Sequence, residues 1–370
     1  MSSDDASGFN TTTIGSIIII VIVVMVTTNT TLNYSSVVFN EHSTGQSLVQ
    51  STTHSTTSST TRSTSRSTTA KAWSPSSVYP SNVWAFSCVT SGGDIYCVGG
   101  LTGPNTITNV ANAVNYAPLL SSGVSHWSST TSYPVGIRSQ SCVTSASKIY
   151  CIGGYTSSAV SNAVYYAPLS SSGVGQWTGT TSYPSPIWAG SCAASDSGIY
   201  CVGGITASQT PSSAVYYAPF SSSGVGQWTN TTSYPAPVIE QSCVTTNNDI
   251  YCVGGRGSNA VYYAPLLSSG VGQWTKTTSY PFPVGPNSAS CVNLGGEIYC
   301  VGGFAGSTIS NAVDHATPSS SGVGQWTAST NYPSIVWGES CVASGSGIYC
   351  VGGNTAASAA LLNTVYSFEP

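Results

Sequence analysis

The chain has 370 residues, of which only 5% are charged, with 7 Lys and Arg against 11 Asp and Glu. The net charge is −4 and no basic stripe is present to neutralise phosphates, which excludes nucleic acid as a partner. The chain has only four histidines and few carboxylates, whereas acid–base and metal chemistry need clustered ionisable groups, so an enzyme is less favoured. Hydrophobic residues make up 40%, including 22 Tyr and 9 Trp, so the chain can bury a large core.

The N-terminal part divides into three segments of different composition. Residues 1–13 are polar, residues 14–28 contain a run of Ile, Val and Met, and residues 29–70 are rich in Ser and Thr. The apolar run predicts a short hydrophobic helix that serves as an uncleaved signal-anchor, with a cleaved signal peptide as the alternative. The Ser/Thr segment lacks the apolar surface needed to offset ordering entropy, which predicts a disordered stalk. We therefore expect an exported chain, tethered to the membrane at the cell surface.

Export would also make some asparagines available for glycosylation. An N-x-Ser/Thr triplet is the acceptor signal for N-linked glycans. Such triplets also arise by chance in Thr-rich sequence, so they add little to the argument for export. They begin at Asn10, Asn29, Asn33 and Asn230.

All twelve cysteines fall into six pairs, and the members of each pair are nine positions apart. An even count in fixed pairs predicts disulfides, which persist outside the reducing cytosol. Zinc is a poor alternative because no pair is a C-x-x-C and the histidines do not accompany the pairs, so we expect no metal and no cofactor. The predicted disulfides are Cys88–Cys97, Cys142–Cys151, Cys192–Cys201, Cys243–Cys252, Cys291–Cys300 and Cys341–Cys350.

Residues 71–370 form six repeats, with Cys pairs spaced by 54, 50, 51, 48 and 50 residues. A period near 50 residues is typical of propeller blades. Each repeat contains four segments rich in Val, Ile, Tyr and Thr and bounded by Gly, Ser, Asn or Pro, which predicts four strands. In the second repeat these strands are expected at 141–144, 149–154, 162–169 and 176–184.

The nine-residue spacing predicts the register of the hairpin between the first two strands. Pairing Cys88 with Cys97 leaves Gly92-Gly93 as a two-residue turn, and most equivalent turns hold residues that tolerate positive φ. Counted outward from the turn, the Cys pair is non-hydrogen-bonded, with Cα atoms about 4.5 Å apart. A disulfide spans Cα separations of about 4.4–6.8 Å, so each hairpin can hold its own bridge.

A Gly doublet, an aromatic residue and a Trp follow each other in these repeats, and this order resembles the kelch repeat. The aromatic-to-Trp spacing of 11 is longer than in the usual kelch unit, and the Cys pair is not a general kelch feature. The resemblance implies an all-β, six-bladed kelch-like β-propeller but no single activity. The doublets are Gly99-Gly100, Gly153-Gly154, Gly203-Gly204, Gly254-Gly255, Gly302-Gly303 and Gly352-Gly353.

The last repeat ends in its third strand and lacks a Trp strand. The missing piece lies at residues 71–80, where Trp73 precedes Tyr79 at the same spacing at which Trp177 precedes Tyr183. We expect this segment to complete the last blade and close the ring. The six tryptophans of the fourth strands are expected to pack between blades: Trp73, Trp127, Trp177, Trp228, Trp274 and Trp326.

A candidate ligand site comes from comparing the repeats with each other. Four positions before the first Cys of a repeat stand Trp84, Arg138, Trp188 and Trp337, which a closed ring would bring into one arc, with Glu240 and Glu339 near them. An aromatic arc with an Arg and two carboxylates suits sugar rings or a peptide segment. The alternative is that these tryptophans cap the core where each inner strand begins.

The function that these patterns favour is non-catalytic binding of a surface glycan or protein. A carbohydrate-active enzyme that uses Glu240 and Glu339 is one alternative. A structural subunit of a surface layer is another. We expect no catalytic residues, and the oligomeric state stays open.

Overall fold

The structure is a computed structural model. It describes the backbone of residues 9–14, 17–28, 31–41 and 47–53, and describes residues 71–370 apart from 104–107, 247, 283–289, 306–307 and 356–359. The chain separates into two compact units, Met1–Ser67 and Thr68–Pro370.

The first unit is an antiparallel sheet of four strands that pair in chain order. Its second strand lies where the sequence predicts a hydrophobic helix, and the β-branched Ile and Val residues of that run favour an extended backbone. Two further strands lie in the segment predicted to be a stalk. The strands are β1 (Phe9–Ile14), β2 (Ile17–Thr28), β3 (Thr31–Glu41) and β4 (Ser47–Thr53).

The part of the chain that the structure describes contains no helix long and apolar enough to cross a membrane. A membrane anchor at residues 14–28 and a stalk at residues 29–70 stay predictions. Among the candidate glycan acceptors, Asn10 and Asn33 lie in β1 and β3, whereas Asn29 lies outside the described residues.

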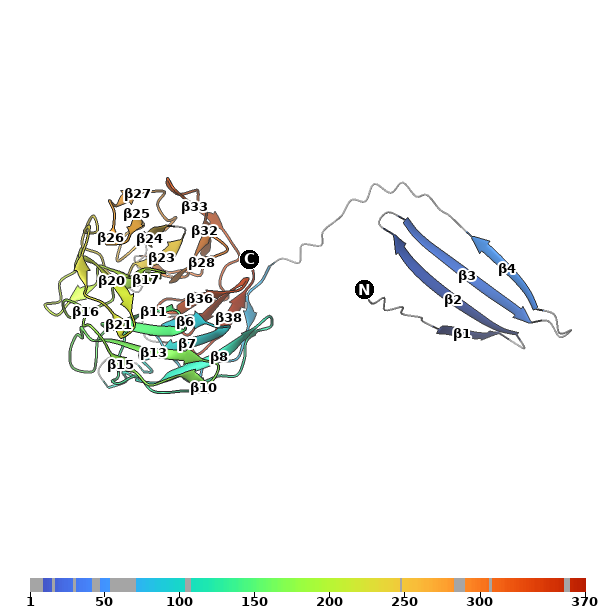
Figure 1. Cartoon of the computed structure of the whole chain (residues 1–370), viewed down its shortest axis with the longest axis horizontal. Helices are drawn as coiled ribbons and strands as arrows, with labels where there is room; N and C mark the ends of the chain where they lie inside the picture. Colours follow the sequence, from blue (N-terminus) through green and yellow to red (C-terminus); the bar gives the residue numbers. More distant parts are fainter. Residues whose placement is uncertain are drawn as a thin grey trace. The chain divides into compact units, whose positions relative to one another are not determined.

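The second unit is a β-propeller whose six antiparallel sheets are arranged as blades around a centre (Figure 1). The first strand of each blade is innermost, and the second pairs with it through the predicted two-residue turn. The first strands are β6 (Ser87–Ser91), β11 (Ser141–Ser145), β17 (Ser191–Ser195), β23 (Ser242–Thr246), β28 (Ser290–Leu294) and β36 (Ser340–Ser344). The second strands are β7 (Asp94–Val98), β12 (Lys148–Ile152), β18 (Gly198–Val202), β24 (Asp249–Val253), β29 (Glu297–Val301) and β37 (Gly347–Val351).

The outer half of each blade consists of a third strand and a short fourth strand. The third strands are β8 (Val114–Leu120), β13 (Val164–Ser170), β20 (Val215–Ser221), β25 (Val261–Leu267), β32 (Val313–Ala316) and β38 (Val365–Phe368). The fourth strands are β10 (Ser128–Ser129), β15 (Thr178–Gly179), β22 (Thr229–Asn230), β27 (Thr275–Lys276), β35 (Thr327–Ala328) and β5 (Ser74–Pro75).

Several two-residue strands extend the third strands or pair the loops. They are β9 (Gly123–Val124), β14 (Gly173–Val174), β16 (Ile187–Trp188), β19 (Ile205–Thr206), β21 (Gly224–Val225), β26 (Gly270–Val271), β30 (Phe304–Ala305), β31 (Thr308–Ile309), β33 (Pro318–Ser319) and β34 (Gly322–Val323). The predicted acceptor Asn230 is exposed at the end of β22.

The hairpin register and all six disulfides are confirmed. In blade 1, Cys88 pairs with Cys97 and Ser91 pairs with Asp94, as the spacing predicts. The Cα atoms of the bonded cysteines are 4.0–4.1 Å apart, slightly closer than expected for the strand pair alone. No free cysteine remains, since all twelve cysteines lie in described residues.

These bonds give a direct chemical prediction. Alkylation of the unfolded full-length chain without prior reduction should label none of the twelve cysteines, because each sulfur is already bonded. Alkylation after reduction should label all twelve, and mass spectrometry of the intact chain distinguishes the two results. Substantial labelling before reduction would contradict the disulfide assignment.

Ring closure also follows the prediction. Strand β5 pairs with β38, with Ser74 opposite Ser367, so residues from the start of the propeller complete its last blade. Trp73, just before β5, is buried and its ring stacks on Phe368 at a centroid distance of 5.0 Å. The ring therefore has no blade with an unpaired third strand at this point.

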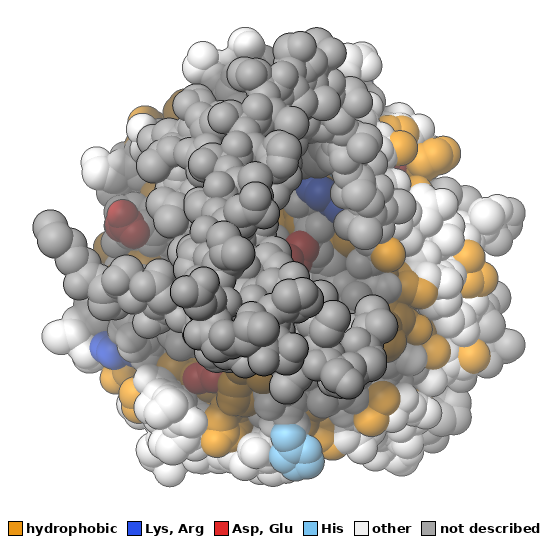
Figure 2. Space-filling model, turned by 90° about the vertical axis from the view of Figure 1, so that its right-hand side faces the viewer, with side chains coloured by type: hydrophobic (Ala, Val, Ile, Leu, Met, Phe, Trp, Pro, Cys, Tyr) orange, Lys and Arg blue, Asp and Glu red, His pale blue; other side chains and the backbone are white. Residues whose placement is uncertain are grey.

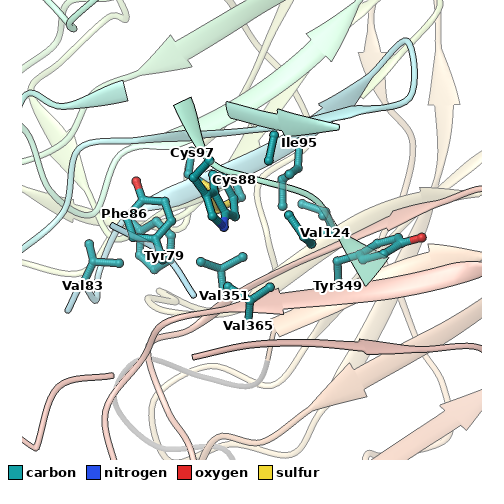
Figure 3. Packing of buried hydrophobic residues seen from close by; sticks show 13 residues of the cluster. Tyr79, Val83, Phe86, Cys88, Ile95, Cys97, Val124, Tyr349, Val351 and Val365 are labelled. Carbon is teal, nitrogen blue, oxygen red and sulfur yellow. A yellow bond between two sulfur atoms is a disulfide. The ribbon is translucent and has the colours of Figure 1, made fainter. Parts of the chain in front are cut away.

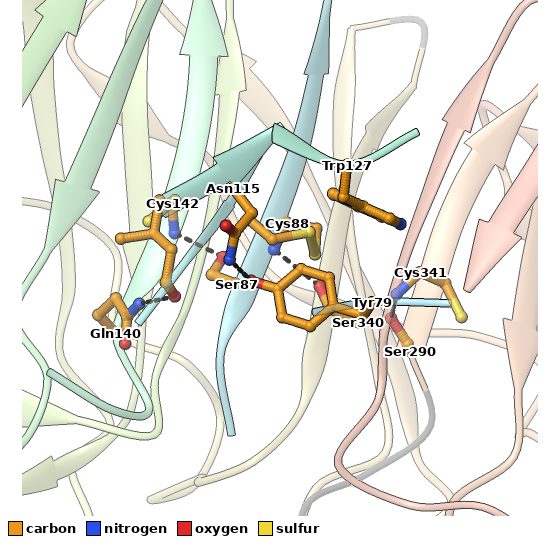
Figure 4. Close-up of a disulfide and its surroundings, with 12 residues drawn as sticks. Tyr79, Ser87, Cys88, Asn115, Trp127, Gln140, Cys142, Ser290, Ser340 and Cys341 are labelled. Carbon is orange, nitrogen blue, oxygen red and sulfur yellow. Dashed lines mark hydrogen bonds between the residues drawn. A yellow bond between two sulfur atoms is a disulfide. The ribbon is translucent and has the colours of Figure 1, made fainter. Parts of the chain in front are cut away.

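A continuous ring of hydrogen bonds joins the inner strands. The backbone N–H of the first Cys in each blade donates to the Ser Oγ at the start of the inner strand before it, at 2.9–3.1 Å. The bond from Cys88 to Ser340 joins blade 1 to blade 6, and it is drawn with two others in Figure 4. The same Ser-Cys dipeptide therefore contributes both to the disulfide within each blade and to the hydrogen bonds that join it to its neighbours.

The seams, meaning the packed surfaces between neighbouring blades, are built around the six tryptophans of the fourth strands. Trp177 has its ring edge-to-face with Tyr133 of the blade before it, with centroids 4.9 Å apart. Its Nε1–H donates to the Thr131 carbonyl at 3.1 Å. The other five tryptophans make the equivalent ring contact and hydrogen bond, which confirms the predicted inter-blade role. Figure 3 shows the buried cluster at the seam between blades 6 and 1.

The Gly doublets are required where blades approach each other. Gly99 has a φ of 68°, and a Cβ there would collide with the Ile137 carbonyl of blade 2. The next glycine, Gly100, donates its N–H to that same carbonyl at 2.8 Å. Only a residue without a side chain allows this contact, so the doublet marks both the end of the second strand and the start of the loop that follows it.

Candidate functional site

The predicted arc lies where each chain segment enters its inner strand. Trp84, Arg138 and Trp337 each form a β-bridge with the residue just after the Gly doublet of the same blade. Trp188 does the same within the pairing of β16 and β19. The four predicted side chains therefore occupy equivalent places in blades 6, 1, 2 and 3. We call the side of the propeller that carries these segments and the second-to-third loops the loop face.

The first aromatic group of the arc joins blades 5, 6 and 1. The rings of Trp84 and Trp337 meet edge-to-face with centroids 5.0 Å apart. Phe304 lies 6.4 Å from Trp337. All three side chains are half-buried, so part of each ring is available at the surface.

The second group centres on a cation. The guanidinium carbon of Arg138 lies 4.6 Å from the ring centre of Tyr155 and 5.3 Å from that of Trp188. The two rings also contact each other edge-to-face at 5.6 Å. Burial lowers the pKa of Arg138, and the nearby Tyr155 acts in the opposite direction. Two aromatic faces thus hold the guanidinium in a fixed position.

Both groups contain hydrogen-bond donors that the described part of the chain does not satisfy. The Nε1 atoms of Trp84, Trp188 and Trp337 and the Nε of Arg138 are buried and have no hydrogen-bond partner among the described residues. Most buried donors in folded proteins are paired. The arc therefore combines half-buried aromatic rings at the surface with donors that lie beneath it without a partner among the described residues.

Sequence reasoning missed two members of the arc, Tyr155 and Phe304. Both stand directly after a Gly doublet, where other blades have Leu101, Ile205, Arg256 or Asn354. This position was recognisable from the repeat alone. Its pairing with the arc position was not, because it depends on how each loop folds back. Of the two remaining arc positions, Ile239 is buried and Asn287 lies outside the described residues.

Glu240 is held by a partner that the sequence did not predict. Arg256 donates from Nη2 to Glu240 Oε1 at 3.2 Å and from Nε to Oε2 at 3.3 Å, a bidentate ion pair. The Glu240 side chain is 5% exposed, whereas that of Arg256 is 52% exposed. A bidentate guanidinium is a strong and directional partner for a carboxylate. The environment of Glu240 is therefore that of an ionised carboxylate fixed from the loop face.

The two predicted carboxylates do share one mouth of the central channel. Glu240 and Glu339 both line a cavity of about 140 Å³, together with residues just before the inner strands of three other blades. Burial raises the pKa of Glu339 to about 8, and both of its carboxyl oxygens lack a hydrogen-bond partner among the described residues. The four arc side chains do not line this cavity.

The backbone at this mouth is unusual. Ala85, Ser139, Ala189 and Glu240 have φ between 51° and 59°, in the left-handed region that non-glycine residues seldom occupy. Each donates its N–H to the carbonyl of the equivalent residue in the blade before it, at 2.7–3.2 Å, beginning with Ala85 to Gly338. Such conformations concentrate at functional sites and need surrounding structure to hold them.

The loop face also has a pocket over blade 4, whose second-to-third loop is the shortest. This cavity of about 270 Å³ is mostly apolar, with Pro237, Ile239 and Tyr262 in its wall and Arg256 at its edge. Figure 2 shows few charged side chains among the described residues that are visible in that view. Binding at such a surface depends on ring contacts and hydrogen bonds more than on charge.

Residues 85–303, more than half of the chain, match the family model described as the KLHDC2/KLHL20/DRC7 Kelch-repeats domain. The chain belongs to the Kelch-repeat family. No curated protein matches the chain.

Among solved structures, the structure of YjhT superposes on this kelch propeller with a TM-score of 0.64. The superposition covers 78% of this chain and 95% of that one, at 13% sequence identity. At this identity the similarity shows the fold alone. Kelch propellers generally act as protein-binding modules, and the fold alone does not determine the activity of a member.

Proposed function

We propose that this chain is an exported, membrane-tethered kelch propeller that binds a protein or glycan partner at the cell surface without catalysis. The binding surface is the arc of Phe304, Trp337, Trp84, Arg138, Tyr155 and Trp188. The observation that carries the proposal is the clustering there of partly exposed aromatic rings, two of which hold a guanidinium.

A protein partner fits this surface best. Aromatic rings and Arg are the side chains most often found at the centres of protein interfaces. The partly exposed rings suit apolar contacts with a bound segment, and the apolar pocket beside Ile239 suits one of its side chains. A glycan would use the same rings for stacking, so the test has to include both ligand classes.

Export is supported by the six disulfides, because such bonds persist in oxidising compartments. The apolar segment at residues 14–28 is the proposed tether. The alkylation experiment described above tests export when it is applied to intact source cells before lysis. Free thiols under those conditions would argue for a reducing compartment.

The binding proposal can be tested with the full-length chain on peptide and glycan arrays. We expect wild type to bind ligands of at least one class on these arrays. Trp84→Ala and Trp188→Ala should each bind the same ligands about tenfold more weakly or worse. The matched control is Leu120→Ala, because Leu120 is 49% exposed beside the Gly92-Gly93 turn, at the other end of the blade. Equal binding by all three variants would contradict the role of the arc.

The same experiment distinguishes the alternatives. Turnover of a bound glycan that Glu240→Gln abolishes would favour the carbohydrate-active enzyme. If the chain binds nothing on the arrays and light scattering shows that it self-assembles, the result would favour the surface-layer subunit. No observation in the structure favours either over binding at the arc.

A further inference from the structure

Two glutamines at equivalent positions join alternate pairs of blades. Gln140 and Gln241 each stand two residues before the first Cys of their blade. Gln140 Nε2 donates to the Val98 carbonyl of blade 1 at 2.7 Å, and Gln241 Nε2 donates to the Val202 carbonyl of blade 3 at 2.7 Å. Both hydrogen bonds are buried, and Figure 4 shows the one made by Gln140.

Blade 6 has a glutamate at this position, Glu339. The position of its side chain matches that of the glutamines, as the neighbouring glycine of the previous blade shows. A Cβ on Gly99 would lie 3.1 Å from Gln140 Nε2, and a Cβ on Gly302 would lie 3.0 Å from Glu339 Oε1. The Glu339 oxygen therefore occupies the place of the donating nitrogen. The equivalent acceptor is the carbonyl of Val301, the last residue of β29.

A carboxylate cannot make this hydrogen bond. An ionised carboxyl group has only acceptor oxygens, whereas a protonated one carries an O–H donor. An ionised Glu339 would place two acceptors together in a buried site, which is costly. A protonated Glu339 would reproduce the bond that Gln140 and Gln241 make.

The groups that face Glu339 do not favour its charged form. Tyr332, from the segment before blade 6, and Tyr280, from the segment before blade 5, are buried, and the charge of Glu339 contributes to raising their pKa values. Asp314 of β32 is buried beside Tyr280, and burial raises its pKa as well. Glu240 shares the channel mouth, but Arg256 pairs with it. The backbone N–H groups of Glu339 and Ser290 act in the other direction and partly offset burial.

We propose that Glu339 is a neutral carboxylic acid in the folded propeller, that its O–H donates to the Val301 carbonyl, and that loss of this proton loosens the seam between blades 5 and 6. The seam is thus a pH-sensitive joint in a ring whose equivalent joints do not titrate. This inference does not depend on the proposed binding function.

The direction of the pH effect follows from the two states of the chain. The pKa of Glu339 is about 8 in the folded chain and has a reference value of 4.5 for an exposed Glu. Between these values the folded state binds more protons than the unfolded state, so stability falls as pH rises. The contribution is complete below about pH 4.5 and is lost above about pH 8.

The test compares thermal unfolding of full-length wild type and Glu339→Gln between pH 5 and pH 9. We expect the melting temperature of wild type, relative to the variant, to fall by about 5 °C across this range, because Gln makes the same bond at every pH. The matched control is Gln241→Glu, which places an acid at the equivalent joint. Its melting temperature should show a second decrease as pH rises, in addition to the one caused by Glu339.

Hydrogen exchange provides a local readout. The N–H of Gly303 donates to the Val336 carbonyl across the seam between blades 5 and 6, and that of Gly100 donates to the Ile137 carbonyl across the seam between blades 1 and 2. After correction for intrinsic rates, protection of Gly303 but not of Gly100 should decrease at high pH in wild type. Identical pH profiles for wild type and Glu339→Gln, or a Glu339→Gln variant that does not fold, would overturn the proposal.

Discussion

A chain that lacks residues 71–80 should fail to form a soluble monomeric propeller. The segment contributes to two seams at once. On one side, Trp73 stacks on Phe368 and donates from Nε1 to the Thr330 carbonyl at 3.0 Å. On the other side, Tyr79 accepts a hydrogen bond from Asn115 of blade 1 at 3.0 Å, and its ring lies 4.9 Å from Trp127.

Without this segment, the third strand of blade 6 would present an unpaired edge beside exposed aromatic rings. Such an edge is a template for pairing with another chain, so aggregation is the expected result. Size-exclusion chromatography with light scattering measures the outcome directly. The control is a chain without residues 54–70, which keeps β4 and residues 71–80 and should stay monomeric and unfold cooperatively. A monomeric, cooperatively folding chain without residues 71–80 would show that the ring does not need this closure.

Trp177→Ala should lower the free energy of unfolding by about 3–5 kcal/mol, as removal of a buried Trp generally does. Trp177 is 6% exposed, packs on Tyr133 and donates to Thr131 of the neighbouring blade. Trp177→Phe should cost less, because the ring contact remains while one hydrogen bond of about 1 kcal/mol is lost.

Urea unfolding under non-reducing conditions measures both variants, and Trp188→Ala is the matched control. Trp188 is half-buried and belongs to the arc, so its replacement should cost clearly less stability than Trp177→Ala. The two tryptophans would then separate by role, one structural and one for binding. Equal losses for Trp177→Ala and Trp188→Ala would support the alternative that the arc tryptophans only cap the core.

The regular features of the propeller could be predicted because they repeat. The nine-residue Cys spacing determines the hairpin register, since only one register places both cysteines opposite each other around a two-residue turn. Ring closure by residues 71–80 followed from the spacing of Trp73 and Tyr79, which matches that of every other blade. Both patterns reflect local geometry that six copies of the unit share.

Other features could not be read from local pattern. Residues 176–184 have strand-like composition, but only Thr178–Gly179 pair with β13. Trp177 and Tyr183 on either side leave the sheet and enter the seams, because the rings that they pack against belong to the neighbouring blades.

The repeat predicts where the arc side chains lie along each blade, but it does not predict their contacts. The arc positions do stand before each inner strand, yet the Arg138–Tyr155 contact and the Glu240–Arg256 ion pair join residues that do not recur between blades. The low content of charged residues likewise predicts a stability that changes little with pH. A count of charges does not show which carboxyl is buried, and Glu339 is the exception that the fold creates.

The closure at β5 also has a mechanical consequence. Any pulling force applied through the chain before residue 71 reaches the propeller at its outermost strand, whose pairing with β38 spans two residues. The load falls first on the ring of Trp73, which is clamped between Phe368 and Tyr332, and only then on the strand. The six disulfides lie in the inner hairpins and bear none of this load until the ring has opened. A tethered propeller of this design would yield under tension at its closing blade first, while each blade keeps its inner hairpin intact.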